Sequence, residues 1–188
     1  MRIIAGEARG KKLFAPTDSS VRPLLDRTRE SIFSTIEGVY DGKCVLDLFS
    51  GVGSFGLEAL SRGARRAVFV DRNEDSLKLL SKNVESLSFG PRAEIVQGDA
   101  LSVPDLTVDQ AEEFALVFLD PPFKMFSVAK QTETIYLRVK EILESRALEA
   151  GGNVILRQPA KFHGRRHLLP TRERTYGEST VLYFCREP

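Results

Sequence analysis

From residue 44 onward, short apolar runs alternate with segments whose apolar residues recur at helical spacing. A short apolar run is typical of a strand buried on both faces, and helical spacing is typical of a helix that covers such a face. The pattern predicts strands at residues 44–49, 67–70, 93–96, 114–119 and 153–157. It predicts helices at residues 26–37, 55–62, 74–87 and 129–148, and the Gly151-Gly152 pair would end the last of them.

The two ends of the chain depart from this alternation. Residues 2–5 and 12–15 predict a β-hairpin around a Gly-rich turn at residues 6–10. Near the other end, residues 167–174 and 180–185 predict two strands joined by a turn. Such a terminal hairpin would add antiparallel pairing to the sheet.

Strands that alternate with helices imply a parallel sheet with helices on both faces. With the terminal hairpin added, the sequence predicts an α/β fold with a mixed sheet. A chain of 188 residues suits one compact core with a small appendage. We expect residues 1–40, which hold the first hairpin and helix, to form the appendage and residues 41–188 to form the main domain.

Composition narrows the protein class. Hydrophobic residues make up 42% and charged residues 28% of the chain, as in ordinary soluble globular proteins. There is no run of about 18 apolar residues and no apolar signal region at the start. We expect a cytoplasmic protein with no membrane partner. The two cysteines, Cys44 and Cys185, are too far apart in sequence to suggest paired metal ligands, and no metal is expected.

Positive charge is concentrated in two segments, although the net charge is only +1. If the two segments meet on one face, they would bind nucleic-acid phosphates. Two separate solvated surfaces would explain the charge equally well. From these segments, the predicted RNA-binding residues are Arg2, Arg9, Lys11, Arg22, Arg27, Arg29, Arg165 and Arg166. The second segment also contains Arg157, Lys161, Arg172 and Arg174.

The segment Gly51-Val52-Gly53-Ser54-Phe55-Gly56 is a G-x-G-x-x-G motif between a predicted strand and a predicted helix. In this motif glycines permit the tight turn, the approach of a ligand to the backbone and the packing of helix on strand. A tight turn without a ligand is the alternative. Asp71 ends the next strand, about 20 residues on, where a carboxylate can accept both ribose hydroxyls of an adenine nucleoside.

Asp47 favours S-adenosylmethionine over NAD as the nucleoside cofactor. It lies inside the first apolar strand, where its charge would repel a pyrophosphate but would suit the cationic amino acid end of S-adenosylmethionine. Asp99, after the third strand, would accept from the adenine amine, or else cap a helix. The predicted cofactor site comprises Asp47, Phe49, Gly51, Gly53, Asp71, Arg72, Asp99 and Ala100.

Asp120-Pro121-Pro122-Phe123 closes the fourth predicted strand and forms the predicted catalytic site. The plain alternative is a turn, because two prolines end any strand. As a site, the Asp120 carboxylate and the Pro121 carbonyl would each accept one N–H of an aromatic amine, so that its lone pair points at a methyl group. The prolines would keep these acceptors fixed, and Phe123 would stack on the base.

Taken together, these motifs resemble class I methyltransferases that modify exocyclic amines of nucleic acids. The chain resembles in particular the RsmD type, the bacterial 16S rRNA guanine-N2 methyltransferases. The similarity extends over nearly the whole chain through Arg2-Ile-Ile-Ala-Gly, Arg9-Gly-Lys-Lys-Leu, Arg22-Pro-Leu-Leu-Asp-Arg-Thr-Arg-Glu, Leu46-Asp-Leu-Phe-Ser-Gly-Val-Gly and Arg174-Thr-Tyr-Gly.

The resemblance implies a seven-stranded sheet of order 3-2-1-4-5-7-6 with an N-terminal hairpin and helix. It implies methyl transfer from S-adenosylmethionine, with S-adenosylhomocysteine as product, to the N2 amine of a guanine in 16S rRNA. The partner would be the small ribosomal subunit or its assembly intermediate, bound by a monomer with residues 1–40 contacting RNA.

Three other functions stay open at this point. An adenine-N6 methyltransferase shares the Asp-Pro-Pro-Phe motif, although the chain lacks the large target-recognition domain usual in the DNA enzymes. A nucleotide-binding redox protein would leave the proline pair without a role. A non-catalytic RNA-binding ribosome-assembly factor would need neither Asp120 nor the glycine motif.

Overall fold

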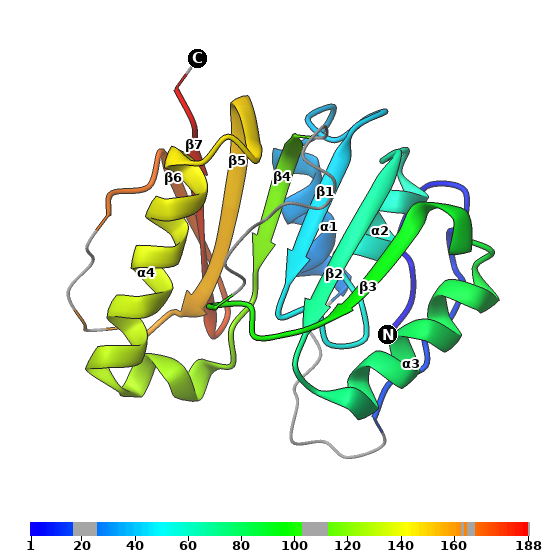
Figure 1. Cartoon of the computed structure of the whole chain (residues 1–188), viewed down its shortest axis with the longest axis horizontal. Helices are drawn as coiled ribbons and strands as arrows, with labels where there is room; N and C mark the ends of the chain where they lie inside the picture. The colour runs from blue at the N-terminus through cyan, green and yellow to red at the C-terminus, as the bar shows by residue number, and fades with distance from the viewer. Residues whose placement is uncertain (17–25, 103–112, 163, 165–167, 188) are drawn as a thin grey trace. The chain divides into compact units, whose positions relative to one another are not determined.

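The computed structural model describes residues 1–16, 26–102, 113–162, 164 and 168–187 (Figure 1). Contacts between residues divide the chain into two compact units, Met1–Ala100 and Leu101–Pro188. None of the described helices is both long and apolar enough to cross a membrane.

In the first unit, the strands β1 (Cys44–Leu48), β2 (Arg66–Asp71) and β3 (Ala93–Gln97) run parallel, with β2 between the other two. Every side chain of β1 and the central side chains of β2 are buried. The apolar runs that predicted β1 and β2 therefore supply core residues of the unit, whereas the residues of β3 are half-buried or exposed.

The helices of this unit are α1 (Asp26–Thr35), α2 (Gly56–Ser61), α3 (Glu74–Ser86) and the short 3-10 turn η1 (Gly90–Arg92). The three α-helices differ from the predicted helices only near their ends, whereas η1 was not predicted. The start of α3 is set by Asn73, whose side chain accepts a hydrogen bond from the Ser76 N–H at 2.8 Å. Leu77, Leu80 and Val84 form the buried face of α3, as their helical spacing predicted.

The second unit contains β4 (Phe114–Leu119), η2 (Phe123–Ser127), α4 (Ala129–Glu144), β5 (Leu148–Pro159), β6 (Arg172–Tyr176) and β7 (Ser179–Cys185). Strand β5 runs parallel to β4 and antiparallel to β7, and β6 pairs with the other edge of β7. The terminal hairpin is therefore confirmed, although β6 starts at Arg172 and residues 165–167 lie outside the described part of the chain.

The strand order of the seven-stranded sheet is β3-β2-β1-β4-β5-β7-β6. This order, together with the flanking helices, confirms the predicted α/β fold and its mixed sheet.

The prediction for residues 145–152 is wrong. The helix α4 ends at Glu144, Ser145 is already extended, and β5 begins at Leu148, so the Gly151-Gly152 pair lies inside a strand. The pair belongs to an irregular stretch where the register of β5 on β4 shifts. Here the Gly151 N–H donates to the Arg186 carbonyl and the Arg186 N–H donates to the Gly152 carbonyl, at 3.2 and 2.9 Å. The glycines thus permit a bulge, a use that local sequence does not distinguish from helix termination.

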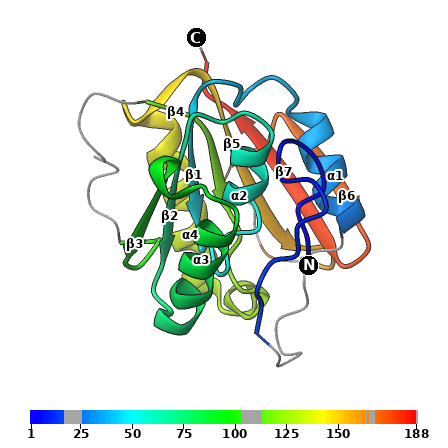
Figure 2. The same cartoon turned by 90° about the vertical axis from the view of Figure 1, so that its right-hand side faces the viewer.

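The N-terminal hairpin is present in reduced form. Arg2 and Lys12 form one isolated antiparallel bridge, not a pair of regular strands. On the turn side of it the Ile3 N–H donates to the Lys11 carbonyl and the Gly10 N–H donates to the Ile3 carbonyl, both at 2.9 Å. In Figure 2 this segment lies beside α1 and α2 of its own unit.

Gly6 is the point of closest approach between the N-terminal segment and α2. Its φ is +81°, and a Cβ built on it would lie 1.7 Å from the Ser61 carbonyl oxygen. Gly10 has a similar φ of +83° but would meet nothing within 4 Å. The two glycines therefore have similar backbone conformations, but only Gly6 packs closely against another part of the chain.

This difference gives a stability test. Gly10→Ala should lower the free energy of unfolding by about 1–2 kcal/mol, the cost of left-handed backbone for an L-residue. Gly6→Ala should lower it clearly more, because the segment must also move off α2. Urea denaturation of both variants measures the difference. Equal losses would show that close approach at Ser61 contributes nothing to stability.

Candidate active site

The loop after β1 begins with an unusual backbone conformation. Phe49 has a φ of +61°, a left-handed value that costs about 1–2 kcal/mol in a residue with a side chain. The turn that follows is closed by the Gly53 N–H, which donates to the Ser50 carbonyl at 2.8 Å. Such strain persists where the surrounding structure imposes it, and it is common at ligand sites.

Each glycine of the motif has a local reason. A Cβ on Gly53 would lie 2.4 Å from the Leu80 side chain of α3, and one on Gly56 would lie 2.3 Å from the Phe69 ring of β2. Glycine at these positions lets the loop and α2 pack closely. A Cβ on Gly51 would meet nothing within 4 Å, so the backbone of the protein there borders open space.

Two carboxylates hold this loop in place. The buried Asp47 accepts a hydrogen bond from the Gly56 N–H at 2.9 Å through Oδ2. Asp71 accepts from the Gly51 N–H through Oδ2 and from the Asn73 N–H through Oδ1, both at 2.8 Å. A carboxylate oxygen can accept two hydrogen bonds, so both oxygens of Asp71 retain capacity for hydroxyl donors.

The remaining predicted cofactor residues flank the same edge of the unit. The Gly98 N–H donates to the Asp71 carbonyl at 3.0 Å, which brings the end of β3 beside the end of β2. Arg72 and Asp99 are exposed, whereas Ala100 is buried. The carboxyl ends of β1, β2 and β3 thus carry the predicted residues at the edge where open α/β sheets bind ligands.

In the second unit, Asp-Pro-Pro-Phe follows β4 directly, as predicted. Pro121 is buried and Pro122 is exposed, while Asp120 and Phe123 are half-buried. The chain turns at once into η2, where the Met125 N–H donates to the Pro122 carbonyl at 2.9 Å. The motif therefore lies in a short, rigid turn with Asp120 and Phe123 still accessible.

Sequence reasoning missed the partner of Asp120, which is Arg157, near the end of β5. Arg157 Nε donates to Asp120 Oδ1 at 2.6 Å and Nη2 donates to Oδ2 at 3.1 Å. Its guanidinium carbon also lies 4.8 Å from the centre of the Phe123 ring. The available signal was an arginine that directly follows the apolar residues of a strand, Val154-Ile155-Leu156, whereas the basic cluster alone gives Arg157 no particular role.

The predicted RNA-binding residues fall into three groups. Arg2, Arg9, Lys11 and Arg27 are exposed, and the Arg2 guanidinium also pairs with Asp26. Arg22, Arg165 and Arg166 lie outside the described residues. Arg29 is wrong as an RNA-binding residue, because its side chain is fully buried.

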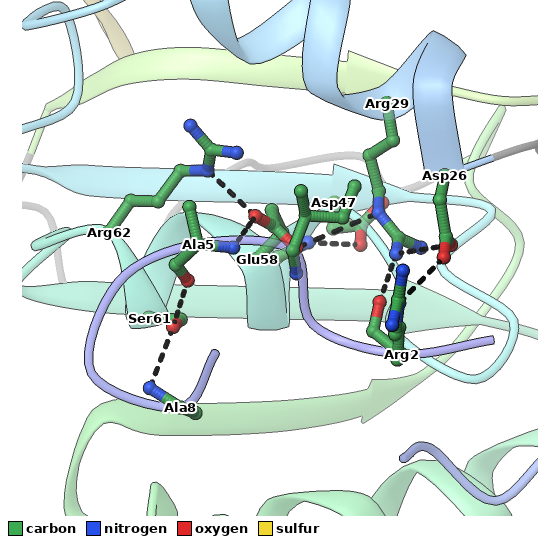
Figure 3. A network of polar contacts seen from close by, with 11 residues as sticks. Arg2, Ala5, Ala8, Asp26, Arg29, Asp47, Glu58, Ser61 and Arg62 are labelled. Atoms are coloured by element: carbon green, nitrogen blue, oxygen red, sulfur yellow. Dashed lines mark hydrogen bonds and ion pairs between the residues drawn. The ribbon is translucent and has the colours of Figure 1, made fainter. Parts of the chain in front are cut away.

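Arg29 instead belongs to a polar network around Glu58 of α2 (Figure 3). Its guanidinium donates to the Arg2 carbonyl and to Asp26, and Nε lies 3.7 Å from Glu58 Oε2. Burial lowers the pKa of Arg29 from its ordinary value, and the charges of Glu58 and Asp26 oppose that shift.

Glu58 is also fully buried and binds the N-terminal segment directly. Its carboxylate accepts from the Ile4 N–H at 2.8 Å, from the Ala5 N–H at 3.1 Å and from Arg62 Nε at 2.7 Å. One turn along α2, Ser61 Oγ donates to the Ala5 carbonyl at 2.6 Å (Figure 3). The backbone hydrogen bonds that a regular hairpin would use are thus taken by α2.

A family model described as Conserved hypothetical protein 95 matches residues 1–185. The chain belongs to this family. Among curated proteins, it is 32% identical to YlbH of Bacillus subtilis strain 168, provisionally named an rRNA methyltransferase, over 98% of each chain. It is 38% identical to ribosomal RNA small subunit methyltransferase D of Escherichia coli K12, over 66% of this chain and 61% of that protein.

Solved structures agree with the family assignment. The Escherichia coli protein yhhF, provisionally named a methyltransferase, superposes with a TM-score of 0.75 at 27% identity, over 100% of this chain and 98% of that one. The resemblance to the RsmD type is therefore confirmed along nearly the whole chain.

The burial of Arg29 gives a second stability test. Arg29→Ala should lower the free energy of unfolding by about 3–5 kcal/mol, because it leaves the buried Glu58 carboxylate with less compensation. Arg27→Ala, two residues away and exposed, should change it by less than about 0.5 kcal/mol. Urea denaturation at neutral pH measures both. A small loss for Arg29→Ala would mean that the Glu58 network contributes little to folding.

Proposed function

We propose that this protein transfers the methyl group of S-adenosylmethionine to the exocyclic N2 amine of a guanine in 16S rRNA of the small ribosomal subunit. The observation that carries the proposal is the Asp120-Pro121-Pro122-Phe123 turn at the carboxyl end of β4, in a chain whose family match covers residues 1–185. The small-subunit rRNA substrate is supported by the name of the Escherichia coli relative.

The residues at the carboxyl ends of β1 and β2 fit the proposed cofactor. Gly51 leaves open space beside the backbone, where a ligand can approach without meeting a side chain. Asp71 is already oriented by two backbone N–H groups, and its oxygens can still accept the ribose hydroxyls. Asp47 would place negative charge near the amino acid end, Asp99 would face the adenine amine, and Phe49, Arg72 and Ala100 would flank the site.

When bound, the cofactor supplies a methyl group on a positively charged sulfur, which is an excellent leaving group. The task left to the protein is to orient the acceptor. The lone pair of a guanine N2 amine is delocalised into the ring, so the amine is a poor nucleophile. If Asp120 and the Pro121 carbonyl each accept one of its N–H bonds, the lone pair is directed at the methyl carbon.

Phe123 would hold the target base by stacking, which requires a base that has left its helix. The exposed side chains Arg9, Lys11 and Arg27 of the first unit would bind RNA phosphates. We further propose that the substrate is the small subunit or its assembly intermediate and that the protein acts as a cytoplasmic monomer.

The direct test of the proposal uses small subunits from cells that lack the protein. Incubation with labelled S-adenosylmethionine should label one guanine of 16S rRNA, and mapping identifies the base and its N2 position. Label on an adenine N6 would support an adenine methyltransferase instead. No label on subunits or their precursors would support a non-catalytic assembly role.

The cofactor site gives a further prediction. Asp71→Ala should weaken binding of S-adenosylmethionine and S-adenosylhomocysteine by about 1–3 kcal/mol, because charged hydrogen bonds to the ribose are lost. Asp75→Ala, which removes an exposed carboxylate from α3, is the matched control and should leave binding unchanged. Isothermal calorimetry measures both. NAD binding as tight as that of S-adenosylmethionine would contradict the cofactor assignment.

The catalytic turn gives the next prediction. Asp120→Ala should leave cofactor and RNA affinity within a few-fold but lower single-turnover methyl transfer by roughly 10²–10³-fold, as when one preorganised polar group is lost. Asp120→Asn should retain part of the rate, because its amide oxygen still accepts an N–H. Full activity in Asp120→Ala would show that the motif is only a turn.

A further inference from the structure

We infer that Arg157 is a positioning residue for methyl transfer: it holds Asp120 and Phe123 together in the arrangement that receives the target base. This inference rests on the proposed function of Asp120. Arg157 contacts both of the side chains proposed to bind the base, and neither its presence nor its partner follows from the Asp-Pro-Pro-Phe motif.

The contact with Asp120 is a bidentate ion pair, in which the forked guanidinium group binds both carboxylate oxygens. Arg157 Nε and Nη2 donate to different oxygens of the same carboxylate, at 2.6 and 3.1 Å. A fork of this kind fixes the plane of the carboxylate as well as its position. The exposed fractions of the two side chains are 17% and 19%, so solvent competes little for these bonds.

Strand register explains why the two residues meet. Leu119 of β4 pairs with Leu156 of the parallel strand β5, so Asp120, the residue after β4, lies beside Arg157 of β5. On its other side Arg157 Nη1 lies 3.4 Å from Ser179 Oγ of β7, the strand next to β5. Because Arg157 and Ser179 both belong to strands, the sheet and not a loop sets the position of the guanidinium.

The contact with Phe123 places the guanidinium over one face of the ring, 4.8 Å from its centre. Cation–π attraction of this kind fixes the ring plane. A target base would stack on the opposite face of Phe123. Arg157 thus sets the planes of both groups that would contact the base. These groups are the Asp120 carboxylate, which would bind the amine of the base, and the Phe123 ring, which would stack on the face of the base.

The fork does not prevent Asp120 from accepting the amine. An ionised carboxylate has about four lone-pair sites, and the guanidinium occupies one on each oxygen. The remaining sites point away from Arg157. Because arginine is a donor only, it orients the carboxylate without competing for the amine hydrogens.

Three Arg157 variants separate positioning from charge. With purified small subunits at saturating concentration, Arg157→Ala should lower the single-turnover rate by roughly 10–100-fold, the scale of a small misplacement of reacting groups. Arg157→Lys should stay nearly as slow, because lysine keeps the charge but lacks the fork and the flat face. Arg157→Gln keeps one neutral NH2 donor group without the charge and should be intermediate. Arg146→Ala, which removes an exposed arginine before β5, should keep the wild-type rate.

Chemical rescue of the rate by added guanidinium distinguishes a positioning role from a merely structural one. Guanidinium chloride at low millimolar concentration should raise the rate of Arg157→Ala several-fold, while methylammonium chloride should not. Thermal unfolding of each variant checks that the chain is folded. In the double variant Asp120→Ala/Arg157→Ala, the loss of rate should be smaller than the product of the two single losses, since Arg157 acts in part through Asp120 and in part through Phe123.

Each other outcome overturns the inference. An unchanged or faster rate in Arg157→Ala, while Asp120→Ala is slow, would show that the ion pair does not assist the reaction, and the proposed function would stand. Arg157→Ala could instead keep a normal rate at saturating RNA but bind RNA more weakly, with the slope of log affinity against log salt concentration reduced by about one. That result would make Arg157 a phosphate contact. Full activity in Asp120→Ala would instead reject the proposed role of the motif itself.

Discussion

The burial of the Glu58 carboxylate is the constraint on which the first unit depends. A buried charge is costly unless it is fully hydrogen-bonded. Here two backbone N–H groups of the N-terminal segment and the guanidinium of Arg62 donate to it, and the Arg29 guanidinium lies close by. If the segment left α2, the buried carboxylate would lose the two backbone hydrogen bonds from Ile4 and Ala5. The segment that bears the exposed Arg9 and Lys11 is thereby fixed to the helix that follows the glycine loop.

The same helix also fixes the other end of that loop. Gly56, the first residue of α2, donates its N–H to Asp47 in β1, and the loop backbone is tied to β2 through Asp71. These hydrogen bonds are accepted by Asp47 and Asp71, the two carboxylates that the sequence analysis predicts to bind the cofactor. The two uses are compatible, because the loop must keep the left-handed turn at Phe49 before any ligand binds.

The parts of the fold that could be predicted from the sequence are those set by local pattern. Examples are the apolar runs at β1 and β4 and the helical spacing in α3. These patterns can be recognised without knowing which distant residues the elements contact. Contacts between distant residues could not be predicted. Glu58 binds Ile4 and Ala5 across more than 50 positions, and Arg157 meets Asp120 across 37. The buried Arg29 was misassigned for the same reason, since a basic segment does not show which of its members turns inward.

Asp71 and Asp120 follow one physical principle in their separate units. Each carboxylate binds donor-only groups, backbone N–H in one case and a guanidinium in the other, through both of its oxygens. Such partners fix the carboxylate plane and leave further lone pairs directed outward. An acceptor that is oriented before its ligand arrives does not have to reorganise when the ligand binds, and this preorganisation is what electrostatic catalysis requires. The ion pair at Asp120 is therefore better understood as preparation for a donor, such as an exocyclic amine, than as a bond that must break to admit it.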